Sequence, residues 1–163
     1  MPVTKNKSEV TATVAVTKKN QSINKRSELT YQWGLTTDRS VAIRTLSTSG
    51  GAIFSSEWLL LDSILEAIDK HPKNSPITSI IFNRQFVGKS ANNPSMLLSH
   101  LVSENLLTPI ENRQRQFHLA MSTQEFKEKI QALLSAADKA KTKPKTVRKK
   151  TSSKKRQLLN STT

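Results

Sequence analysis

The sequence predicts an α+β fold in which a three-helix core is followed by a two-stranded hairpin. A capping residue followed by proline predicts the start of a helix, and this pair occurs at Ser75-Pro76 and again at Asn93-Pro94. These are the first two of three observations behind the prediction. The third is the polar stretch 111–115, which separates two short extended runs as the tip of a hairpin does. Together they predict helix, turn, helix and hairpin in that order.

The charge of the chain is concentrated at its ends. Of the net charge of +14 over 163 residues, residues 1–29 contribute +4, residues 30–137 contribute +1 and residues 138–163 contribute +9. Both ends are polar and lack periodicity, so we expect them to be disordered arms around one domain over 30–137. Polycationic arms attract phosphate in a salt-sensitive manner. The alternative is that these arms only aid solubility.

The first part of the expected domain has the pattern of a β-hairpin. Tyr31, Trp33 and Leu35 alternate with polar neighbours, as in a half-buried strand, and residues 40–46 return as its partner. Two glycines then break the chain at positions 50–51. No Gly-Lys-Ser/Thr follows them, so we expect a turn rather than a phosphate-binding loop.

Residues 57–69 predict the first helix of the core. One side of this segment is acidic at positions 62, 66 and 69. No further ligand follows at metal-binding spacing, so we expect a solvated acidic side that points away from DNA. The opposite side carries the apolar stripe Trp58, Leu61, Ile64, Leu65 and Ile68.

An amphipathic helix is expected after the hairpin. Ser122 and Glu125 form a capping box, because a hydroxyl and a carboxylate three residues apart each accept a backbone N–H. Apolar residues follow at helical spacing over 123–137. This stripe either packs back on the domain, against Trp33 or Trp58, or forms a homodimer.

Residues 56–121 resemble the winged helix-turn-helix superfamily, in which a Leu-Leu pair such as Leu106-Leu107 leads from the recognition helix into a wing rich in Arg and Gln. The resemblance implies a winged helix-turn-helix fold, a three-helix core plus β-wing, with the helix 94–106 in the major groove of DNA. The basic segment 138–163 is also similar in composition to the tail of linker histones.

This arrangement nominates candidate residues for nucleic-acid binding. Asn side chains recognise adenine, Ser side chains donate to bases or phosphates, and Arg and Lys neutralise phosphate. The wing residues suit the minor groove. The candidates are Arg84, Lys89, Asn92, Asn93, Ser95, Ser99, His100, Ser103, Arg113 and Arg115 in the domain, and Lys143, Lys145, Arg148, Lys149, Lys150, Lys154, Lys155 and Arg156 in the tail.

The predicted function is DNA binding, as a transcriptional regulator or an architectural, nucleoid-type factor with double-stranded DNA as partner. The alternative is a winged-helix adaptor or an RNA-binding subunit of a larger complex. Such a protein belongs in the cytoplasm of a bacterium, at the nucleoid, or in the nucleus of a eukaryote.

Several other classes of function have no support in the sequence. The chain has no cysteine, which removes thiolate chemistry and Cys-based zinc sites. No nucleophile-elbow or nucleotide-binding motif occurs, so we expect neither an enzyme nor a cofactor or metal. No apolar run approaches the roughly 18 residues that span a bilayer, so we expect no membrane partner.

Overall fold

The computed structural model describes residues 9–142, which form two antiparallel sheets and four helical segments. The strands are β1 (Ala12–Gln21), β2 (Glu28–Thr36), β3 (Val41–Thr48), β4 (Leu59–Leu60), β5 (Leu107–Ile110) and β6 (Arg113–Leu119). The helices are α1 (Leu61–Lys70), the 3-10 helix η1 (Ser79–Phe86), α2 (Asn93–Ser103) and α3 (Thr123–Thr142).

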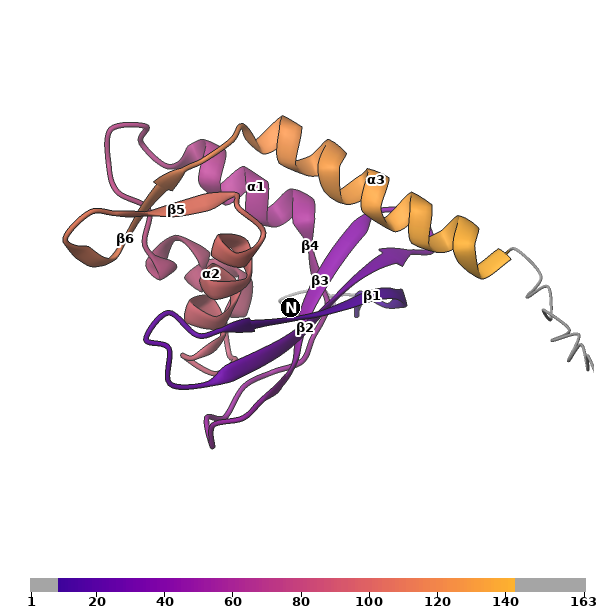
Figure 1. Cartoon of the computed structure of the whole chain (residues 1–163), viewed down its shortest axis with the longest axis horizontal. Helices are drawn as coiled ribbons and strands as arrows, with labels where there is room; N and C mark the ends of the chain where they lie inside the picture. Colours follow the sequence, from indigo (N-terminus) through magenta and orange to yellow (C-terminus); the bar gives the residue numbers. More distant parts are fainter. Residues whose placement is uncertain (1–8, 143–163) are drawn as a thin grey trace, which may run out of the picture.

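A four-stranded antiparallel sheet in the order β1-β2-β3-β4 supplies one side of the core. Alternate residues of β2 point inward, so Leu29, Tyr31 and Trp33 are each no more than 1% exposed. The helices pack on that inner face, and β5 and β6 form a separate hairpin beside them (Figure 1). The β2–β3 hairpin expected from the sequence is present, with Trp33 opposite Ile43.

The prediction of a winged helix-turn-helix is wrong. A three-helix core leaves one side of its recognition helix in solvent, whereas α2 is covered by the four-stranded sheet as well as by η1 and β5. Eight of its eleven residues are buried, including the polar Asn93, Ser99 and His100. The second helix of the expected core is the short 3-10 helix η1. The strand-rich first half of the chain therefore builds the core, and α2 cannot enter a DNA groove with the side expected to face solvent.

The expected disordered arm over 1–29 is also corrected, because residues 12–21 form β1, an edge strand paired with β2. Its inward positions carry polar side chains that find partners inside the protein. Lys18 bonds to Glu104 and Asn20 bonds to His100. These partners lie about 80 residues away in sequence, so a strand that looks too polar to fold is held in place. The disorder expected beyond residue 142 lies outside the described residues, whereas 138–142 continue α3.

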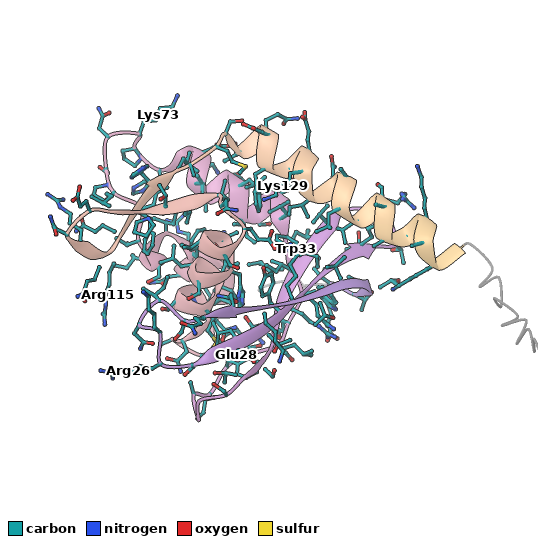
Figure 2. The ribbon with its side chains drawn as sticks, viewed as in Figure 1. Arg26, Glu28, Trp33, Lys73, Arg115 and Lys129 are labelled. Carbon is teal, nitrogen blue, oxygen red and sulfur yellow. The ribbon has the colours of Figure 1, made fainter. Side chains whose placement is uncertain are left out.

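The stripe of α3 packs back on the domain, which is one of the two roles expected for it. Phe126, Ile130 and Leu134 are fully buried, and the ring of Phe126 lies 6.1 Å from that of Trp33. Figure 2 shows Trp33 in the interior beneath this helix. A homodimer through 123–137 would therefore have to use the polar sides of α3.

The acidic side of α1 is exposed, as expected, and two of its three carboxylates also contact α3. Lys127 pairs with Asp62 at 2.7 Å, and the Thr123 hydroxyl donates to Asp69 at 2.9 Å. Within residues 9–142 no three His, Asp or Glu side chains lie close enough together to hold a metal ion. None of the helices in this part of the chain is both long and apolar enough to cross a bilayer.

Candidate nucleic-acid interface

A hollow of about 370 Å³ lies between the β1–β2 turn and the β5–β6 hairpin, above one end of α2. Both projections reach the same side of the molecule, at the left in Figure 1. Because segments more than eighty residues apart line a single hollow, they form one surface. Gln21, Ile23 and Lys25 line it from the turn, Val102 and Ser103 from α2, and Gln114 and Phe117 from the hairpin.

Four exposed cations lie on the two projections, where Lys25 lines the hollow and Arg26, Arg113 and Arg115 are next in sequence to residues that line it. None of the four has an ion-pair partner among the described residues. Lys25 and Arg26 belong to the turn, and Arg113 and Arg115 belong to β6. Figure 2 shows Arg26 and Arg115 at the same edge of the molecule. Other cations of the domain, such as Lys19, Lys70 and Lys127, are neutralised by carboxylates. Lys73 and Arg84 are also exposed without an ion-pair partner among the described residues, but they belong to other elements. We call Lys25, Arg26, Arg113 and Arg115, which lie on the two projections, the basic edge.

Local hydrogen bonds fix the shape of the β1–β2 turn. The Asn24 carboxamide oxygen accepts from the Arg26 N–H and the Ser22 hydroxyl, and that hydroxyl accepts from the Ser27 N–H. Lys25 sits at φ +60°, in the left-handed region that costs a lysine conformational energy. The turn thus presents two adjacent cations on a backbone whose conformation is fixed by hydrogen bonds.

The tip of the hairpin is built in the same way. Ile110 pairs with Arg113, so Glu111 and Asn112 form a two-residue loop. Asn112 takes φ +62°, a conformation that Asn tolerates better than most residues. At the base, Phe117 is 2% exposed and its backbone bonds to that of Ile77 at 2.8 and 2.9 Å. The hairpin is therefore anchored in the core while Arg113 and Arg115 project beyond it.

His100 connects α2 to the sheet underneath the hollow. Its Nδ1 lies 2.9 Å from the Asn20 carboxamide oxygen, and its Nε2 lies 2.8 Å from the Thr45 hydroxyl. An oxygen acceptor on one side and a hydroxyl donor on the other suit a neutral imidazole that carries its proton on Nδ1. Burial lowers the pKa of His100 to about 3, although the nearby Glu104 carboxylate acts in the opposite direction.

Glu104 is the second buried polar group that holds α2 to the sheet. Its carboxylate accepts from the Tyr31 hydroxyl at 2.6 Å and the Trp33 indole at 3.0 Å, and it pairs with Lys18 at 2.9 Å. Burial alone raises the pKa of Glu104, but these three donors outweigh it and hold that pKa below its ordinary value. Burial and the neighbouring carboxylate raise the pKa of Tyr31. The Lys129 ammonium donates to the Glu104 carbonyl at 2.7 Å, which ties in α3.

The structure separates the residues that the sequence nominated. Arg113, Arg115 and Ser103 lie at the hollow or beside it, and the buried Ser99 also lines it, so these candidates are brought together. Ser95 and Arg84 are exposed elsewhere, on α2 and η1. Ser99 and the remaining candidates of the domain already have partners inside the protein, namely Lys89 with Glu57, Asn92 with the Ile53 carbonyl, Asn93 with the Ser55 backbone, Ser99 with the Ile23 N–H, and His100 as above. The tail candidates lie outside the described residues.

Lys25, Arg26, Gln21 and Gln114 were missed as candidates. The polar composition of β1 predicts a disordered arm that includes the turn residues, so they do not stand out as candidates in the sequence. The signal that marks them is the pair of extended stretches, 12–21 and 28–36, around a turn rich in Ser and Asn. In the sequence Gln114 is only part of the polar tip 111–115, because its position beside α2 follows from tertiary structure.

The buried imidazole makes a prediction about pH. Because His100 has a lower pKa when folded than when unfolded, the unfolded chain binds one more proton between pH 6.5 and about 3. As the pH is lowered through that window, we expect His100 to reduce the free energy of unfolding by up to about 1.4 kcal/mol per pH unit. Chemical denaturation of the wild type, His100→Gln and the control His71→Gln at pH 7, 6 and 5 checks this. The slope of the free energy of unfolding against pH is expected to be smaller in His100→Gln but not in His71→Gln. Equal slopes in all three proteins would refute it, as would His100 ring signals that titrate near pH 6 in NMR spectra.

Comparison of the chain with protein-family models, with curated proteins and with solved structures finds no match. Nothing in these comparisons identifies a winged helix-turn-helix superfamily, so the resemblance found in the sequence has no support from them.

Proposed function

We propose that the protein binds DNA, with the basic edge as the contact surface of the folded domain and the lysine-rich segment 138–163 as a second source of attraction. The observation that carries this proposal is the gathering of four unpaired cations around one hollow. Six other cations of the described domain are paired with carboxylates, whereas these four have no ion-pair partner among the described residues. A polyanion is the partner that such a surface fits.

The chemistry of the edge suits a sugar–phosphate backbone. Guanidinium groups bind phosphate through two parallel N–H donors, and Arg113 and Arg115 offer this geometry two residues apart on one strand. Arg113 is held by the Gln116 side chain at 3.0 Å, which limits the entropy lost on binding. A regulator or an architectural factor that depends on phosphate contacts of this kind shows modest sequence preference and steep salt dependence.

The proposal predicts the effect of removing the two arginines. In the full chain, Arg113→Ala/Arg115→Ala is expected to weaken binding to a DNA duplex about tenfold and to lower the salt slope by roughly 1 to 2, because two phosphate contacts are lost. Fluorescence anisotropy at several salt concentrations measures both quantities.

The matched control removes two cations that already have carboxylate partners. Arg39→Ala/Lys70→Ala changes the net charge equally but takes away Arg39–Asp138 and Lys70–Glu66 pairs rather than free charge. We expect a decrease of less than about threefold. Equal losses in the two double variants would show that net charge alone governs binding and would refute the basic edge as a contact surface.

A further inference from the structure

We propose that the hollow beside the basic edge receives one unpaired base of a DNA strand, while Lys25, Arg26, Arg113 and Arg115 hold the neighbouring phosphates. This inference rests on the proposed DNA binding and specifies the form of DNA bound at that site.

The lining of the hollow fits the faces of a base. Ile23, Val102 and Pro109 contribute apolar surface from three different elements, and Phe117 adds to it from beneath. The faces of a base are flat and apolar, so they gain by leaving water between such side chains. The volume of about 370 Å³ also lies within the roughly 300–1,000 Å³ of small-molecule sites. A stacked duplex has no free base face to offer, whereas a single strand does.

Two amide side chains line the hollow where they could hydrogen-bond to the pairing edge of a base. Gln21 on β1 and Gln114 on β6 are exposed, line the hollow from opposite projections and have no side-chain hydrogen bond within the described residues. Each amide offers a donor and an acceptor, which is the combination that the pairing edge of a base requires. By contrast, internal hydrogen bonds already engage the side chains of Ser22, Ser99 and Asn20. The hollow thus retains only part of its polar lining for a ligand.

The charges identify the ligand as part of a nucleic acid rather than a free uncharged ring. Cations flank the hollow on both projections, and no Asp or Glu lines it. An inserted base carries a phosphate on each side along the strand, and the turn and the hairpin each provide two cations for them. Sites for single strands combine a positively charged surface for the backbone with side chains on which the bases stack.

The test compares a single DNA strand of about 20 nucleotides with an abasic strand of the same length, so that phosphates are equal and only bases differ. By fluorescence anisotropy, the full chain is expected to bind the base-containing strand about tenfold more tightly. Gln21→Ala/Gln114→Ala removes most of that difference and leaves affinity for the abasic strand unchanged. The control Gln124→Ala/Gln131→Ala, on exposed positions of α3, keeps the difference. Ser103→Trp, which fills the hollow, also removes it.

The outcomes separate this inference from the proposed function. Equal affinity for the two strands, or tighter binding of a duplex than of the base-containing strand, overturns base insertion while leaving DNA binding intact. Tighter binding of an RNA strand of the same sequence overturns the assignment to DNA. No binding to the single strand or the duplex at low salt overturns the proposed function itself. The strand comparison uses the unaltered chain, so the inference stays open to refutation even where a variant fails to fold.

Discussion

Glu104→Ala is expected to lower the free energy of unfolding by about 3–5 kcal/mol, which is a large part of the stability of a domain this size. The carboxylate is 3% exposed and receives hydrogen bonds from Tyr31 and Trp33 and an ion pair from Lys18. Its removal leaves two buried donors and one half-buried ammonium without an acceptor. Urea denaturation followed by tryptophan fluorescence measures the loss, since Trp33 reports on this site.

The control for this effect is an exposed carboxylate in an ion pair, Glu28, which pairs with Lys19 at 3.0 Å. Glu28→Ala is expected to cost less than about 1 kcal/mol. Because the pKa of Glu104 is lower in the folded protein, its stabilisation is present above its unfolded pKa, near 4.5, and is lost as the pH falls through the folded value. A loss in Glu104→Ala no larger than that in Glu28→Ala would contradict the account of how α2 is held to the sheet.

Ending the chain at Thr142 is expected to have the largest effect on DNA affinity. The deleted residues 143–163 carry eight Lys or Arg and no acid, and the described fold ends with α3 at Thr142. Loss of several phosphate contacts weakens binding about 100-fold or more at roughly 0.1 M salt, with little dependence on DNA sequence. Anisotropy titrations with two unrelated duplexes measure this.

A full-length chain with Gln at those eight positions is the matched control, because it retains length and loses only charge. We expect it to behave like the shortened chain, and the melting temperatures of both to match the wild type. Unchanged affinity in the Gln-substituted chain would show that the lysine-rich segment does not contribute through charge.

Local patterns predicted the elements that bury apolar residues at regular spacing. The alternation of Tyr31, Trp33 and Leu35 marks β2, and the stripe that contains Phe126 and Ile130 marks α3. These residues form their elements because one face of each is apolar, which is visible along the chain. The hairpin with Arg113 and Arg115 was likewise visible from its polar tip.

The parts that failed depend on long-range polar contacts. Lys18 and Asn20 make β1 look like a solvated arm, yet their partners Glu104 and His100 are supplied by α2 and its C-cap. The same contacts made Ser99 and His100 look like an exposed reading face, although they are satisfied beneath the sheet. Alternation along one segment does not show which distant side chain neutralises a polar group. The sequence therefore predicts the α+β class and the Arg113–Arg115 hairpin, but not the four-stranded sheet or the turn that carries Lys25 and Arg26.

The measurement that tests the central claim most directly is an NMR titration of the isotope-labelled full chain with a single DNA strand. If the basic edge is the contact surface of the folded domain, the largest changes in backbone amide shifts within residues 9–142 fall on residues 21–27 and 111–117. Addition of salt to roughly 0.5 M reverses them, because the contacts are with phosphate. Largest changes on α1 and α3, or on the outer face of the sheet, with residues 21–27 and 111–117 unaffected, would contradict the account.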